Sequence, residues 1–99
     1  MDNDTVALKL ASAAVMEIDV AYRLANGPGQ FALAGPRDQA WTAYALARQN
    51  LLMDGVIVTD AQLDELDALG SELGRAADTN AIATSAVRLA QVLARIALV

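Results

Sequence analysis

The sequence predicts an all-α protein, a four-helix antiparallel bundle that we expect to be dimeric. Three observations predict this class. Apolar residues recur at alternating steps of three and four over long segments, glycine and proline concentrate between segments, and helix-capping residues stand at segment starts. Because 99 residues can bury one core but hardly two, we expect residues 1–99 to form a single domain.

The first helix is expected over residues 5–25, with Asp4 as its N-cap. Gly27 and Pro28 supply the usual stop signal after it. Its buried side follows a heptad spacing of apolar residues: Leu8, Ala11, Val15, Ile18, Tyr22 and Ala25.

Residues 26–36 are expected to form a loop, because they hold three of the six glycines and both prolines. Phe31 and Leu33 within this segment either tuck under the bundle as a plug or stand out as contacts for a partner. The second helix is expected over residues 37–53, and Gly55 would end it. Its buried side is marked by larger residues at helical spacing: Trp41, Tyr44, Ala45, Leu51 and Leu52.

The third helix has the clearest start signal in the chain. Thr59 and Gln62 have the spacing of a capping box, and Val58 and Leu63 stand in the positions of a hydrophobic staple. A third helix is therefore expected over 60–77, after a short β-branched connector at 56–58. Its inward positions are leucines: Leu63, Leu66, Leu69 and Leu73.

The fourth helix is expected to begin after Asp78 or Thr79 and to cover residues 79–98. Its apolar heptad is Ile82, Ala86, Leu89, Leu93 and Ile96. Its polar stripe includes Arg88 and Arg95, near the C-terminal end, where the helix dipole favours positive charge.

Hydrophobic residues make up 56% of the chain, which is high for a soluble protein. A chain this short has difficulty burying that much apolar surface, so we expect a homodimer. We expect it to form through the alanine-rich faces of the first and fourth helices, which carry Ala7, Ala11, Ala14, Ala86, Ala90 and Ala94. The absence of a signal-like N-terminus and the charges within the apolar helices predict a cytoplasmic protein with no membrane span.

Histidine and cysteine are absent from the sequence, so the usual general base, the best nucleophile and the commonest metal ligands are missing. We therefore expect no enzyme, no metal site and no cofactor. Residues 27–32 match the spacing of a dinucleotide-binding loop, but that loop follows a strand, whereas a helix is expected before these residues. We therefore expect no dinucleotide site here. Residues 50–61 fit a calcium loop poorly, because the twelfth position of such a loop requires a carboxylate and is Ala61 here.

Glu17 and Asp19 are the two carboxylates within the apolar first helix. Residues two apart point to different faces, so they cannot form a catalytic dyad, and Asp19 is expected to pair with Arg23 one turn later. One alternative function stays open: a small-molecule-binding bundle or carboxylate-dependent enzyme with a pocket near Glu17, Tyr22 and Trp41.

Negative charge is concentrated in residues 54–77, whose net charge of −5 equals that of the whole chain. The acids expected to share a face of the third helix are Asp60, Asp64, Glu65, Asp67 and Glu72. A helix-turn-helix across residues 46–66 would bring these acids against phosphate, so we expect no direct binding of nucleic acid.

The acidic face is either a solvated outer surface, whose first acids complement the helix dipole, or a docking surface for a basic partner. We expect a non-enzymatic protein-interaction module, such as an adaptor, a small chaperone or an inhibitor. Its partner is expected to carry a basic surface that in some cases also binds nucleic acid. Phe31 and Leu33 are further expected contacts.

Overall fold

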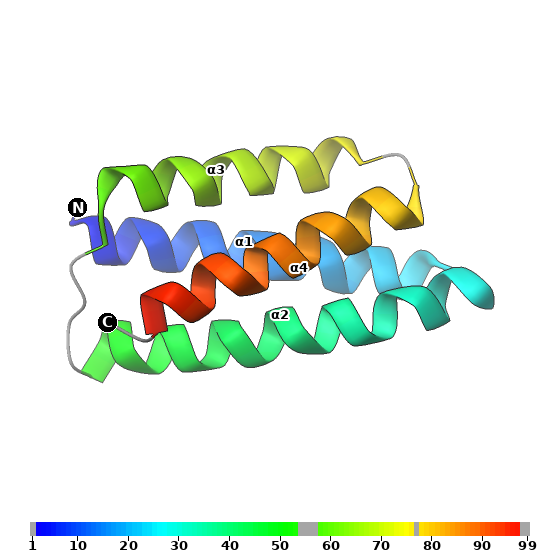
Figure 1. The fold of residues 1–99 in the computed structure, drawn as a ribbon, viewed down its shortest axis with the longest axis horizontal. Coiled ribbons are helices and arrows are strands. Elements are labelled where there is room, and N and C mark those ends of the chain that lie inside the picture. Colours follow the sequence, from blue (N-terminus) through cyan, green and yellow to red (C-terminus); the bar gives the residue numbers. More distant parts are fainter. Residues whose placement is uncertain (1, 54–57, 77, 98–99) are drawn as a thin grey trace.

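The computed structural model describes residues 2–53, 58–76 and 78–97, and over these ranges it contains four α-helices and no strand. The helices are α1 (Asn3–Leu24), α2 (Pro28–Met53), α3 (Asp60–Arg75) and α4 (Thr79–Ala97). They enclose one hydrophobic core, which confirms the all-α bundle (Figure 1). The expected stop at Gly55, the connector residues 56–57 and the expected helix ends at 77 and 98 lie outside the described residues.

Helices that follow one another in the chain run in opposite directions, as Figure 1 shows. Around the bundle, however, their order is α1, α2, α4, α3, so that α1 lies beside α3 and α2 beside α4. Both of these pairs are parallel: Asn3, which begins α1, donates a hydrogen bond to the carbonyl oxygen of Val58, just before α3. Asn50, near the end of α2, donates to the carbonyl oxygen of Ala97, which ends α4. The bundle therefore consists of two antiparallel hairpins, α1–α2 and α3–α4, whose like-directed helices touch.

The predicted N-cap of α1 is wrong by two residues. Asp2 caps the helix, because its carboxylate accepts a hydrogen bond from the Thr5 amide at 2.7 Å. The carboxylate of Asp4 instead accepts the backbone N–H of Val58 at 3.0 Å. Asp4 therefore ties α1 to the start of α3 rather than capping its own helix.

The predicted loop over 26–36 is wrong for residues 28–36, which form the first turns of α2. Pro28 occupies the first helical position, where its missing N–H has no intrahelical partner to lose. Gly27 precedes it with a φ of +48°, and its carbonyl oxygen accepts the Phe31 amide at 3.0 Å. Gly35 and Pro36 disfavour a helix locally, but burial of Leu33 stabilises it.

The predicted buried side of α2 is also partly wrong. Its inward residues are small: Ala40, Ala43 and Ala47. Trp41, Tyr44 and Leu51 pack against the core from the side and are partly buried, whereas Ala45 and Leu52 are exposed. Alanines face the bundle because α2 and α4 form the most extensive helix pairing in it, and large side chains would hold these helices apart.

The predicted starts and core residues of α3 and α4 are confirmed, but the predicted end of the third helix is not: α3 ends at Arg75, and Ala76 is its extended C-cap. The Thr59 hydroxyl accepts the Gln62 amide at 3.1 Å, and the Gln62 side chain accepts the Thr59 amide at 3.0 Å, which completes the capping box. Asp78 caps α4 by accepting the Ala81 amide at 2.8 Å. The two helices contribute the expected large side chains to the core: Leu66, Leu69, Leu73, Leu89, Leu93 and Ile96.

Candidate binding surfaces

The five acids expected on the third helix divide into two groups in α3. At about 100° per residue, Asp60, Asp64 and Asp67 share one line along the helix, on the side away from the core leucines. All three are exposed. Glu65 and Glu72, seven residues apart, lie on the flank that faces α4.

Arginines of α4 compensate the charges of Glu65 and Glu72. Arg95 lies 3.1 Å from Glu65, and Arg88 lies 3.0 Å from Glu72, which also accepts a hydrogen bond from the Ser85 hydroxyl at 3.3 Å. Sequence reasoning missed both pairs. The available signal was a matched spacing of seven residues, Glu65 to Glu72 on one helix and Arg88 to Arg95 on an antiparallel neighbour.

Asp60, Asp64 and Asp67 form what we call the acidic stripe. Asp60 accepts a hydrogen bond from the neutral side chain of Asn3 at 2.9 Å. Among the described residues, Asp64 and Asp67 have neither a hydrogen-bond donor nor a cation paired with their carboxylates. The acidic stripe therefore carries the uncompensated part of the charge of α3.

A groove of about 250 Å³ between α1 and α3 adjoins the acidic stripe. Asp67 lines it from α3, and Glu17 lines it from α1. Its accessible apolar lining comes from Leu10 and Ala13 of α1, whereas Leu66 of α3 lies beneath it and is fully buried. The groove thus combines two carboxylates from different helices with an apolar wall, an arrangement that the sequence did not predict.

The pocket considered for Glu17, Tyr22 and Trp41 is not brought together by the structure. Glu17 is exposed in the groove between α1 and α3, whereas the Tyr22 ring lies under the guanidinium of Arg37, 4.7 Å from its centroid. Trp41 packs against the core and meets Tyr44 edge to face, with ring centroids 5.9 Å apart. The three residues occupy three different environments.

Asp19 lies in a polar cluster between α1 and α2. The predicted pair with Arg23 is confirmed at 3.1 Å, and Arg37 of α2 lies closer, at 2.7 Å. The hydrogen bond from Arg37 holds the pKa of Asp19 below its ordinary value of 3.8, and Arg23 adds to this, although burial acts in the opposite direction. Arg37 could not be assigned from the sequence because the preceding segment was expected to be a loop. The cluster ties the first hairpin together and leaves Asp19 compensated.

Phe31 and Leu33 lie on different sides of α2. Residues two apart on a helix point to different sides, so Leu33 is 1% exposed whereas Phe31 is 86% exposed. Leu33 is buried in the bundle, as the first of the two alternatives expected, and its side chain is not accessible to a partner. Phe31 remains accessible as a contact.

The alanine faces expected to form the dimer lie largely inside the chain's own core. Ala7, Ala11 and Ala14 of α1 and Ala86 of α4 are buried there. The alanine face of α1 is therefore already covered by the neighbouring helices. On α4, Ala94 remains exposed.

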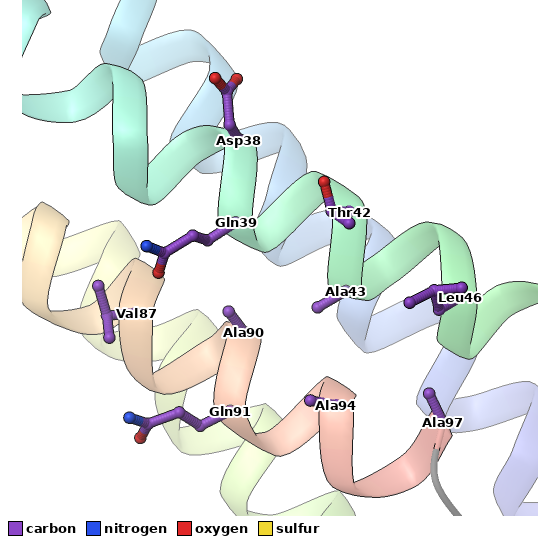
Figure 2. Close-up of a pocket in the computed structure, with 10 residues that line it drawn as sticks. All are labelled: Asp38, Gln39, Thr42, Ala43, Leu46, Val87, Ala90, Gln91, Ala94 and Ala97. Carbon is purple, nitrogen blue, oxygen red and sulfur yellow. The ribbon is translucent and has the colours of Figure 1, made fainter.

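A second, larger groove of about 600 Å³ runs between the parallel helices α2 and α4 (Figure 2). Its apolar lining comprises Ala43, Leu46, Val87, Ala90, Ala94 and Ala97. Gln39, Thr42 and Gln91 supply neutral polar groups, and Asp38 is the one charged residue among the described residues that line it. We call this feature the α2/α4 groove.

Within the described ranges, no three side chains of His, Cys, Asp or Glu gather closely enough to hold a metal ion. None of the helices in these ranges combines the length and the apolar character needed to cross a bilayer.

Comparison with protein-family models, with curated proteins and with solved structures finds no match to this chain. Charge, burial and shape are therefore the observations that bear on its function.

Proposed function

We propose that this protein is a non-enzymatic binding module that docks a basic protein partner on the face formed by α1 and α3. The observation that carries the proposal is the uncompensated acidic stripe, joined by Glu17 across the adjoining groove. Glu65 and Glu72, which the sequence placed in the same face, are excluded from it by their arginine partners. The docking surface is thus Asp60, Asp64, Asp67 and Glu17.

The groove between α1 and α3 supplies more than charge. Lysine and arginine have long apolar stems that lie along apolar surface while the charged end reaches polar groups. Such a stem fits along Leu10 and Ala13, where its cation meets Glu17 and Asp67. This arrangement supports a basic side chain as the anchor of the partner.

The class of partner follows from the negative charge of this surface. A face with four carboxylates attracts a basic patch, steers its approach and repels nucleic-acid phosphate. An adaptor, a small chaperone or an inhibitor that competes with nucleic acid for the basic patch would each use it in this way. A cytoplasmic location, expected from the sequence, completes the proposal.

The test uses a fluorescently labelled octalysine peptide as the probe and anisotropy as the readout. We expect Asp67→Lys to weaken binding by about fivefold or more, because one favourable contact is replaced by a repulsive one. Asp38→Lys is the matched control, since it changes the net charge equally but lies in the α2/α4 groove. Equal weakening by the two variants would show attraction by total charge alone and contradict the proposed surface.

We also propose that the chain self-associates. Seven large hydrophobic side chains are exposed among the described residues: Met16, Val20, Leu24, Phe31, Leu46, Leu52 and Met53. Monomeric proteins rarely leave extended apolar surface uncovered. Sedimentation equilibrium should give twice the chain mass of 10.4 kDa at micromolar concentration. A mass of 10.4 kDa up to about 100 μM, where even weak dimers form, would refute self-association.

A further inference from the structure

We propose that a second copy of this chain binds in the α2/α4 groove, so that two copies meet through the same surface about a two-fold axis. The inference rests on the proposed self-association and names the surface responsible for it. It replaces the alanine face of α1, which the chain's own core covers.

The shape of the groove suits another copy of itself. Alanines at its floor, including Ala43, Ala90 and Ala94, let the backbone of another helix approach closely. Leu46 stands at its edge and is 54% exposed. In a two-fold contact, Leu46 of each copy is buried against the alanine floor of the other, which supplies a projection and a matching hollow on both sides.

The polar groups of the groove are self-complementary as well. Gln39 and Gln91 carry amides and Thr42 carries a hydroxyl, and each of these groups both donates and accepts hydrogen bonds. They can therefore pair with their own kind across a two-fold axis, which two carboxylates or two ammonium groups cannot do.

Asp38 does not oppose this contact. It points away from α4 in Figure 2, and its carboxylate lies 3.6 Å from Arg37. It is eight residues from Leu46, about 12 Å along the helix. A two-fold axis perpendicular to the helices places the two Asp38 residues at opposite ends of the interface, well apart, and makes the facing helix pairs antiparallel.

Charge distribution favours a second copy over a charged partner at this face. The helix order around the bundle puts the α1/α3 face, with the acidic stripe and Glu17, on the opposite side. Two copies with a net charge of −5 each repel one another wherever those acids meet. At the α2/α4 groove the acids point outward from the dimer, so each copy keeps its docking surface accessible.

Sedimentation equilibrium of the full chain and of substituted chains tests the inference. Leu46→Lys and Ala94→Lys, from the two walls of the groove, should each raise the dimer dissociation constant by about tenfold or more, because each buries a charge without a partner. Leu52→Lys is a matched control on the same helix, since Leu52 is 57% exposed and does not line the groove. Its dissociation constant should equal that of the unsubstituted chain.

Val20→Lys distinguishes the groove from the exposed apolar side chains of α1, Met16, Val20 and Leu24, of which Val20 is 48% exposed. A dimer that Val20→Lys or Leu52→Lys disrupts, and that Leu46→Lys and Ala94→Lys leave intact, would overturn the inference while self-association stands. A monomeric unsubstituted chain would overturn self-association itself. Circular dichroism checks that each variant keeps its helix content, and agreement between the two groove variants guards against a folding defect in either.

Discussion

The two hairpins contribute side chains of different size to one core. The α3–α4 hairpin contributes mostly large side chains: Leu66, Leu69, Leu73, Leu89, Val92, Leu93 and Ile96, with Ala86 as the exception. The α1–α2 hairpin contributes six alanines, Ala7, Ala11, Ala14, Ala40, Ala43 and Ala47, with Val15, Ile18 and Leu33. One hairpin therefore projects into the core and the other receives it. We therefore expect the hairpins to tolerate opposite changes, with α3–α4 sensitive to truncation of its side chains and α1–α2 sensitive to their enlargement.

The largest effect is expected from truncation in the projecting hairpin. Leu89 is fully buried, so Leu89→Ala should lower the free energy of unfolding by about 2–5 kcal/mol through lost burial and a residual cavity. Urea unfolding followed by circular dichroism measures the change. Leu52→Ala, at an exposed position, should change the free energy of unfolding by less than about 0.5 kcal/mol. Similar losses in both variants would show that Leu89 does not occupy the interior.

Enlargement in the receiving hairpin should cost somewhat less. Ala40 is fully buried, and Ala40→Leu should lower the free energy of unfolding by about 1–3 kcal/mol, because the added atoms separate the helices. Ala45→Leu, on the exposed side of the same helix, is the control and should have little effect. A stabilised Ala40→Leu variant would mean that the hairpins leave a void at this position.

The same asymmetry explains which elements the sequence predicted. Leucines at heptad spacing and a complete capping box mark the projecting hairpin, and both α3 and α4 start where expected. Alanine is common on buried and exposed helix faces alike, so periodicity alone could not identify Ala40, Ala43 and Ala47 as the inward side of α2. Of the residues that the pattern did indicate, Trp41 packs against the core only from the side and Leu52 is exposed.

The capping box of α3 is the next test. Thr59→Ala removes the acceptor for the Gln62 amide and should lower the free energy of unfolding by about 1 kcal/mol. Thr84→Ala, at an exposed position within α4, removes a hydroxyl that caps no helix and should cause no loss. The difference between the two variants in urea isolates the cap, and equal stabilities would contradict its role.

Ala32 tests the corrected first turns of α2. It is exposed within the helix, so Ala32→Gly should lower the free energy of unfolding by about 1 kcal/mol, because glycine disfavours a helix interior. Gly27→Ala should lower it as well, since Gly27 adopts a positive φ that side chains disfavour. Urea unfolding followed by circular dichroism measures both changes. Unchanged stability of Ala32→Gly would indicate that residues 28–36 are not helical in solution.

The cluster around Asp19 should make the stability of the chain depend on pH in acidic solution. Because Arg37 depresses the pKa of the folded carboxylate, the unfolded chain binds protons first as the pH falls. The contribution of Asp19 to stability is complete above about pH 3.8, the pKa of the unfolded chain. It disappears as the pH falls through the lower pKa of the folded chain. As the pH falls from about 6 to about 2.5, the urea midpoint should decrease less in Asp19→Asn than in the unsubstituted chain. Equal decreases would exclude Asp19 as a source of the acid sensitivity.

The binding surfaces were less predictable than the helices. The sequence located the acids of α3, but separating Asp64 and Asp67 from Glu65 and Glu72 requires the antiparallel placement of Arg88 and Arg95. The α2/α4 groove depends on two parallel helices lying side by side. Helix direction and neighbourhood arise from the packing of whole hairpins, which no local pattern in the chain encodes.

The contact between Asn3 and Val58 has a consequence for how the chain folds. It joins residues 55 positions apart, and the other contacts between parallel helices are similarly distant in sequence. An isolated α1–α2 hairpin has few large apolar side chains to bury against itself, and helices need tertiary contacts to be stable in water. The first half of the chain thus gains its main stabilisation after the second half is present. We therefore expect folding to be a single cooperative event in which the α1–α2 hairpin is not stable on its own.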